Sequence, residues 1–135
     1  GVGSALRALK PDVKIVAAEP ATAAPLAASL RAGAASRFPE WEASFVDGAG
    51  GKAVLPSMWP LLSTLVTDSI VVSLDEVAQA MRIVAERARV VSEGAAACAV
   101  AAALTGRAGQ GKIVAVVSGG NIDLARFAAL TTNGA

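Results

Sequence analysis

The sequence predicts an α/β fold with three layers, in which helices cover both faces of a mostly parallel sheet. Short runs rich in β-branched residues at 13–18, 69–72 and 112–117 predict buried strands. Segments with helical spacing separate them, and strands that alternate with helices in this way form parallel sheets. Three strands make a small sheet with open edges, so we expect these residues to be part of a larger two-domain fold.

The helices follow from apolar spacing and from the residues that end them. We expect helices at residues 2–9, 23–32, 60–66, 74–90, 95–104 and 123–130. Pro11 ends the first helix and Gly33 ends the second, because proline lacks the amide donor and glycine adopts the left-handed C-terminal conformation. Residues 34–58 are rich in glycine and proline and predict a long loop.

The helix at 74–90 has the clearest local signal. Ser73 and Glu76 have the spacing of a capping box, in which each side chain bonds the other residue's backbone amide. Leu74, Val77 and Met81 then begin an apolar stripe that predicts one buried face. The alanine-rich helix at 95–104 is apolar on every side, so we expect it to be buried.

Composition excludes several classes of function. The net charge is +1 and no basic stripe with interleaved aromatic residues is visible, so nucleic-acid binding is not expected. The apolar stretch at 94–104 is too short to span a bilayer. The chain has no histidine to activate Cys98, which we interpret as a small buried hydrophobe. A single cysteine is compatible with a reducing, cytoplasmic location.

The stretch at residues 114–123 is the most informative part of the chain. A β-branched run ends at Ser118, and Gly119, Gly120 and later Asp123 follow, which predicts a strand, a tight turn and a helix start. Ligands of open α/β sheets bind where loops leave the carboxyl ends of strands. Taken alone, a glycine pair after a strand more often reflects ordinary turn chemistry.

Other motifs occur in a definite order with this one. They are Val16-Ala17-Ala18-Glu19-Pro20, Phe45-Val46-Asp47-Gly48, Trp59-Pro60, Ser73-Leu74-Asp75-Glu76-Val77, Ala85-Glu86-Arg87 and Val91-Ser92-Glu93-Gly94-Ala95. Their order and spacing resemble the C-terminal part of the serine/threonine dehydratases. These enzymes belong to the tryptophan-synthase-β-like group of pyridoxal-phosphate enzymes, which also contains serine racemase. The resemblance extends from Leu6 to about Leu130.

The resemblance implies a pyridoxal-phosphate-dependent reaction that converts L-threonine or L-serine to a 2-oxo acid and ammonia. Residues 1–135 would be the C-terminal segment of the large cofactor-binding domain, in a homo-oligomer. The family's Schiff-base lysine lies in a Ser-Phe-Lys-type motif, and none of Lys10, Lys14, Lys52 and Lys112 has that setting. We therefore expect an N-terminal segment to supply the lysine, and this segment alone to be inactive. The alternatives are a serine racemase and a non-catalytic fragment that pairs with other chains.

The resemblance also assigns four cofactor-binding residues and no catalytic residue. Ser118 matches the residue that hydrogen-bonds the pyridine nitrogen, and Gly119 belongs to the same turn. Glu93 matches a cofactor-side glutamate near the start of a buried helix, and Gly48 matches a loop glycine that lines the cofactor. Simpler roles remain open: a strand-end serine, a carboxylate stabilised by a helix dipole, and an Asp-Gly turn.

Two further features could be mistaken for ligand sites. Glu19 matches one carboxylate of a Mg²⁺ or Ca²⁺ site found in some family members, but Pro25 stands where the second is expected. Because hard cations prefer several charged oxygens, we expect Glu19 to be structural and no metal to bind. Residues 106–112 have P-loop spacing, but they follow a helix and precede a strand, so we interpret them as a solvated loop.

Overall fold

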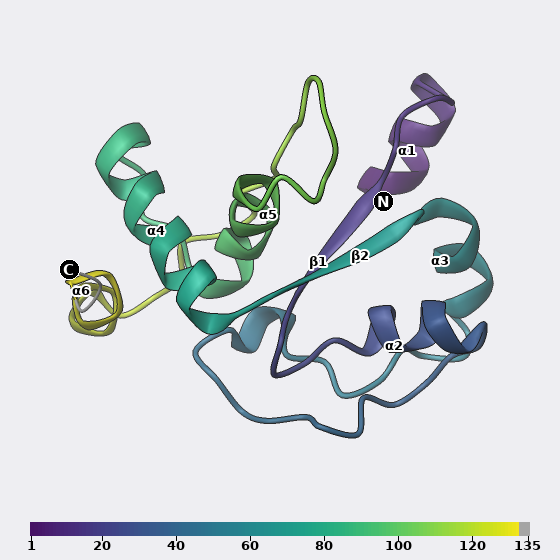
Figure 1. The fold of residues 1–135 in the computed structure, drawn as a ribbon, viewed down its shortest axis with the longest axis horizontal. Coiled ribbons are helices and arrows are strands. Elements are labelled where there is room, and N and C mark those ends of the chain that lie inside the picture. Colours follow the sequence, from purple (N-terminus) through teal and green to yellow (C-terminus); the bar gives the residue numbers. More distant parts are fainter. Residues whose placement is uncertain (133–135) are drawn as a thin grey trace.

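The computed structural model describes residues 1–132 and has the predicted α/β class, with helices around a small parallel sheet (Figure 1). Its elements are α1 (Val2–Leu9), β1 (Val16–Pro20), α2 (Pro25–Ala32), the 3₁₀ turn η1 (Asp47–Ala49), α3 (Trp59–Leu65), β2 (Asp68–Val72), α4 (Leu74–Ala88), α5 (Gly94–Leu104) and α6 (Leu124–Thr132). All six predicted helices are present, and no helix end differs from its predicted position by more than two residues.

The sheet of the described part consists of β1 and β2. The strands are parallel, with Val16 opposite Asp68 and Pro20 opposite Val72. Figure 1 shows α4 and α5 on one side of these strands and α2 and α3 on the other, so the sheet lies between two helical layers. The expected three-layer arrangement is therefore confirmed, although the sheet of the described residues has two strands where three were expected.

Two strand predictions were wrong in detail. The first strand begins at Val16, three residues later than expected, because the pairing with β2 starts there. The third expected strand, at residues 112–117, is extended but pairs with no strand in the part of the chain that the structure describes. Its side chains are largely exposed, and Val114 is 86% accessible. The sequence has the right β-branched pattern, but a strand also needs a neighbour to accept its backbone hydrogen bonds.

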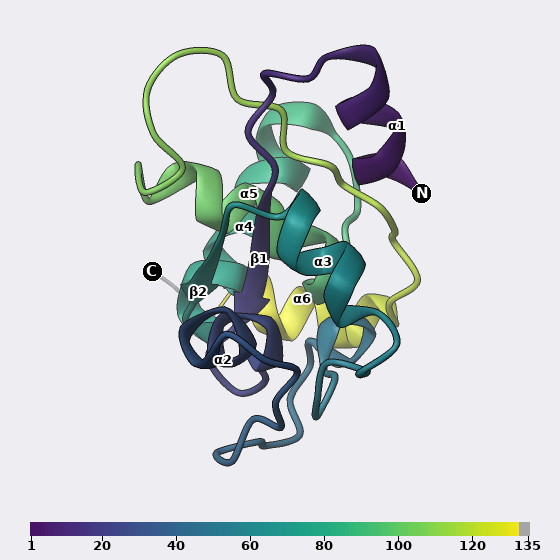
Figure 2. The ribbon, with the colours of Figure 1, turned by 90° about the vertical axis from the view of Figure 1, so that its right-hand side faces the viewer.

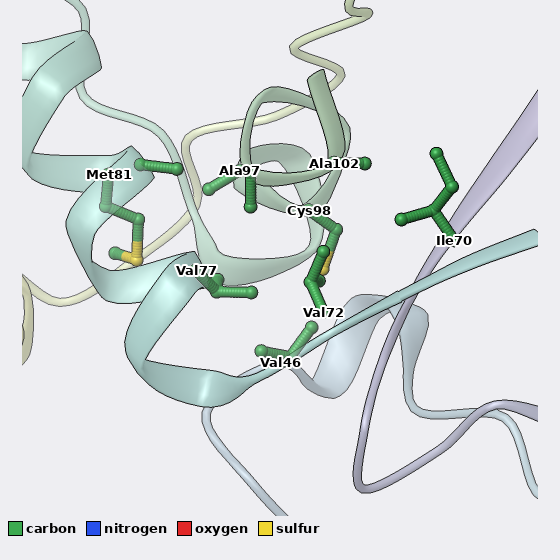
Figure 3. Packing of buried hydrophobic residues seen from close by; sticks show 10 residues of the cluster. Val46, Ile70, Val72, Val77, Met81, Ala97, Cys98 and Ala102 are labelled. Atoms are coloured by element: carbon green, nitrogen blue, oxygen red, sulfur yellow. The ribbon is translucent and has the colours of Figure 1, made fainter. Parts of the chain in front are cut away.

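The core lies between β2, α4 and α5 (Figure 3). Val72, Val77 and Met81 are fully buried there, and the alanines of α5 let the two helices pack closely. Cys98 points into the same cluster, and burial raises the pKa of its thiol to about 11. The thiol is therefore protonated at neutral pH, which confirms the interpretation of Cys98 as a small hydrophobe.

Helix α4 begins with a capping box and ends at a residue in the left-handed conformation. The Glu76 amide donates to Ser73 Oγ at 3.1 Å, and the Ser73 amide donates to Glu76 Oε2 at 2.7 Å, which confirms the predicted capping box. Arg89 adopts a left-handed conformation (φ 59°) and ends the helix at Ala88. The sequence does not predict this end of the helix, because arginine rarely adopts the left-handed conformation.

The long loop between α2 and α3 has a little structure of its own. It contains η1 and an isolated antiparallel bridge between Arg37 and Ala53. The Trp41 indole nitrogen donates to the Gly50 carbonyl at 2.9 Å, which ties two parts of the loop together. None of the helices formed by residues 1–132 has the length and apolar character needed to cross a membrane.

Candidate functional site

The start of α5 is joined to the glycine turn that follows the extended segment. Glu93 is the N-cap residue of α5, with extended backbone, and its amide donates to the Gly119 carbonyl at 3.1 Å. Residues far apart in sequence are therefore held together by a backbone hydrogen bond. This contact positions the turn after Ser118 against the positive end of a helix dipole.

Close approach explains why both residues of the turn are glycine. A Cβ atom on Gly119 would lie 2.6 Å from Glu93 Oε1, and one on Gly120 would lie 2.5 Å from the Val91 carbonyl oxygen. Neither glycine has a positive φ, so the requirement is space and not backbone conformation. The turn thus packs directly on residues 91–93.

The loop that contains η1 also packs against the start of α5. A Cβ atom on Gly48 would lie 3.0 Å from Ala95 Cβ and 3.7 Å from Glu93 Oε1. One on Gly94 would lie 2.9 Å from the Phe45 ring. The structure therefore brings together three of the four predicted site residues, because Gly48 and Gly119 both lie against Glu93.

The Glu93 carboxylate has unused hydrogen-bonding capacity. The side chain is half-buried, and within residues 1–132 its oxygens make no hydrogen bond or ion pair. An ionised carboxylate is an acceptor for several donors, so a partly buried one without partners is suited to a ligand that carries N–H or O–H groups.

Ser118 lies next in sequence to the cluster formed by Gly48, Glu93 and Gly119. It directly precedes Gly119, its side chain is exposed, and within the described residues its hydroxyl has no hydrogen-bond partner. The hydroxyl is therefore available to a ligand at the carboxyl end of the extended segment. Its contact with a cofactor nitrogen remains a prediction.

The side chain of Glu19, unlike those of Glu93 and Ser118, has hydrogen-bond partners within the described residues. Its carboxylate accepts hydrogen bonds from the Leu26 and Ala27 amides, both at 2.8 Å, and from Ser69 Oγ at 2.6 Å. It thus caps α2, whose own N-cap residue is Ala24 and provides no side-chain acceptor. The expectation that Glu19 is structural is confirmed, but the sequence analysis did not identify its role as the cap of α2, although Pro25 in the first turn of a helix without a polar cap was a usable signal.

The described residues contain no cluster of three or more Cys, Asp or Glu side chains that could hold a metal ion. All four lysines are exposed, and the Lys52 ammonium lies 4.0 Å from the Trp41 ring centroid. That arrangement is a surface cation–π contact, and Lys52 is not placed as a nucleophile.

Comparison of the sequence with known families gives one assignment. Residues 1–119 match the family described as pyridoxal-phosphate dependent enzyme. The serine racemase of rice (Oryza sativa) is 36% identical over 132 residues, which cover 92% of this chain and 38% of that protein. The L-threonine ammonia-lyase of Thermotoga maritima is 35% identical over 125 residues, which cover 92% of this chain and 31% of that protein.

Solved structures give the same result. Maize serine racemase superposes with a TM-score of 0.83 at 33% identity, over 93% of this chain and 41% of that one. Threonine deaminase isoform 2 from Solanum lycopersicum, in its processed form, superposes with a TM-score of 0.84 at 25% identity, over 96% of this chain and 39% of that one. The chain therefore spans less than half the length of these similar proteins.

Proposed function

Because this chain belongs to the family of pyridoxal-phosphate dependent enzymes, we propose that it is the C-terminal segment of the cofactor-binding domain of a serine/threonine dehydratase. The reaction would remove the α-proton and the β-hydroxyl of L-threonine or L-serine and give a 2-oxo acid and ammonia. The observation that carries the proposal is the meeting of Gly48 and Gly119 at the unpartnered carboxylate of Glu93.

The residues present fit pyridoxal phosphate. Gly48 and Gly119 both lie against Glu93 with no side chain of their own, which keeps the site compact and suits the close approach of a flat ring. The Glu93 carboxylate supplies an acceptor, and the Ser118 hydroxyl supplies a neutral donor. When bound, the cofactor withdraws electrons from the substrate's α-carbon and so stabilises the charge left when the α-proton departs.

The identity of the donor at Ser118 matters for the reaction. A hydroxyl donates a hydrogen bond to a ring nitrogen without holding that nitrogen protonated, as a carboxylate would. With Ser118 in this role, a bound cofactor would be a weaker electron acceptor, which would limit the build-up of negative charge and suit prompt loss of the β-hydroxyl. Ser118 thus supports elimination over slower reactions at the α-carbon.

We propose that an N-terminal segment supplies the lysine that holds the cofactor and the loop that binds its phosphate. Four exposed lysines lie outside the Glu93 cluster in the described structure, and more than half of each similar protein lies outside its match to this chain. On this proposal, residues 1–135 alone have no dehydratase activity.

The test combines this chain with the unmatched part of a relative. We define the assembled protein as residues 1–135 produced together with the part of T. maritima L-threonine ammonia-lyase outside its match, or with the corresponding part of rice serine racemase. We expect pyridoxal phosphate to give a protein-bound absorption band, and L-threonine to give a 2-oxo acid, with both donors. The 135-residue chain alone should give neither.

The products decide between the candidates. With L-serine as substrate, formation of D-serine without 2-oxo acid, with both donors, would favour a serine racemase, a reaction that the name of the rice relative supports. A folded assembled protein that binds no pyridoxal phosphate would contradict the proposal and favour a non-catalytic interaction domain.

Ser118→Ala in the assembled protein tests the cofactor contact. Loss of the hydroxyl leaves a buried ring nitrogen without its donor, which costs roughly 1–3 kcal/mol, so cofactor affinity or turnover should fall about 5- to 150-fold. The exposed Ser57 provides a matched control, and Ser57→Ala should change neither quantity. Unchanged affinity and turnover in Ser118→Ala would show that Ser118 only ends the extended segment.

A further inference from the structure

The glycine-rich loop that follows α5 has a defined backbone. Three of its glycines have positive φ angles, a conformation that residues with a side chain rarely adopt, and they are Gly106, Gly109 and Gly111. The hydroxyl of Thr105, the residue that ends α5, accepts a hydrogen bond from the Arg107 amide at 3.2 Å. The loop therefore turns sharply after the helix and holds the backbone of Arg107 in place.

The side chain of Arg107 reaches from this loop to the end of β2. Its guanidinium donates to the Val71 carbonyl at 2.9 Å and lies 3.6 Å from the Glu76 carboxylate of α4. Both charged side chains are partly exposed, so their mutual attraction is weak, and the hydrogen bond to the strand is the more specific contact. Arg107 thus provides the donor that a neighbouring strand would otherwise provide.

The Val71 carbonyl lies on the edge of β2 that faces away from β1. The Ala21 amide donates to the Val72 carbonyl at 2.7 Å, which directs the backbone groups of Val72 toward the β1 side. Backbone groups of successive residues in a strand point to opposite edges, so those of Ser69, Val71 and Ser73 point outward. Within residues 1–132, β2 pairs with β1 and with no other strand. Figure 2 shows β2 on the outer side of β1, with the loop that follows α5 on the same side.

Two carboxylates bind amides on the same outer edge. The Ser69 amide donates to Asp68 Oδ1 at 2.8 Å. The Ser73 amide donates to Glu76 Oε2 at 2.7 Å. Charged side chains therefore engage backbone groups along the whole outer edge, from its first outward residue to the start of α4. Charged side chains on an edge strand are one means by which proteins prevent another strand from adding there.

The sequence of β2 would favour pairing if this edge were open. Residues 69–72 are Ser-Ile-Val-Val, without charge or proline, and β-branched residues favour extended backbone. An open edge of this kind is a template for a strand of another chain, and a second copy of this chain presents the same strand. Antiparallel pairing of β2 with β2 of a second copy is symmetric, so it would close as a dimer.

We propose that Asp68, Glu76 and Arg107 protect the outer edge of β2 and prevent it from pairing with β2 of a second copy of this chain. Arg107 has the largest part. It occupies an edge carbonyl, and a symmetric pair would bring two Arg107 side chains to one shared edge, where like charges repel. This role gives the glycine-rich loop a purpose without a phosphate ligand. No cofactor or substrate takes part, so the proposal does not depend on the proposed function.

Replacement of Arg107 in the 135-residue chain tests the proposal. In sedimentation, Arg107→Ala should associate with rising concentration to twice the mass of the unchanged chain under the same conditions. The Val71 amide points outward, so in this variant it should exchange at least about 10-fold more slowly at high than at low protein concentration. Lys112→Ala removes the same charge from an exposed residue at the end of the same loop, and it should behave as the unchanged chain.

A second variant opens the same edge at another position. Asp68→Ala removes the acceptor of the Ser69 amide and should produce the same association, more weakly than Arg107→Ala. Protected amides in α4 and α5 show that each variant is folded. Unchanged mass and unchanged Val71 exchange in the folded variants would overturn the proposal. So would association of Arg107→Ala without slower Val71 exchange, because the new contact would then lie elsewhere, or equal association of Lys112→Ala, because charge alone would then keep the copies apart.

Discussion

Glu19 and Glu93 both lie next to the N-terminus of a helix, yet their carboxylates are used differently. Glu19 is buried, and three donors from α2 and β2 occupy its two oxygens. Glu93 is half-buried and begins α5, and within the described residues its oxygens have no partner. Residue type and helix position are therefore poor guides to function here.

The difference lies in what each carboxylate still lacks. A carboxylate whose oxygens accept three short hydrogen bonds contributes to folding, and little capacity remains for a ligand. A carboxylate beside two glycines, with no donor of its own, is open to a ligand and contributes less to the stability of the chain. The following predictions test this division between a structural and a ligand-directed glutamate.

The largest effect is expected for Glu19→Ala in the 135-residue chain. It leaves two α2 amides and the Ser69 hydroxyl without an acceptor, so the free energy of unfolding should fall by about 3 kcal/mol. Glu93→Ala removes no hydrogen bond within residues 1–132 and should change the same quantity by less than about 0.5 kcal/mol. Urea denaturation followed by circular dichroism measures both. Equal losses for the two variants would remove the distinction between these glutamates.

The two glycines of the turn provide the next contrast. Gly120→Ala directs a Cβ atom at the Val91 carbonyl, 2.5 Å away, so the backbone must shift and stability should fall by about 2 kcal/mol. Gly119→Ala directs one at the Glu93 carboxylate, 2.6 Å away, which can rotate aside at a cost below about 1 kcal/mol.

Cofactor affinity distinguishes these variants further. In the assembled protein, Gly119→Ala should weaken pyridoxal phosphate binding more than its small loss of stability explains, because it displaces Glu93. If Gly119→Ala retained full affinity, the Glu93 carboxylate would have no part in holding the cofactor.

Local signals predicted the helices better than they predicted the sheet or the contacts of the site. The capping box of α4 depends on residues three positions apart, and it was visible in the sequence. The contact between Glu93 and Gly119 is long-range, and only the family resemblance indicated it. The expected strand at 112–117 is not paired in the described structure, because strand pairing depends on a neighbouring strand as well as on local sequence. The cap of α2 was not predicted, because its acceptor, Glu19, lies outside the helix.

Glu76 offers a third use of a glutamate, as a local cap. Ser73→Ala removes the acceptor of the Glu76 amide and half of the capping box, so the free energy of unfolding should fall by about 1 kcal/mol. Ser63→Ala, in an exposed turn of α3, is the matched control and should have a smaller effect. A fall in the activity of the assembled protein at full stability would place Ser73 in the site instead.

The smallest effect concerns divalent metal ions at Glu19. A Mg²⁺ or Ca²⁺ ion would have to displace the donors from α2 and Ser69, and Pro25 provides no second carboxylate. Ligand-linked stabilisation depends on the ratio of ion concentration to the dissociation constant, so millimolar ion should raise the melting temperature of the assembled protein by less than about 1 °C. The measurement compares chelator with added ion in the unchanged protein and in Glu19→Gln. A rise of many degrees that Glu19→Gln abolishes would show that this carboxylate exchanges its helix-capping bonds for a metal ion.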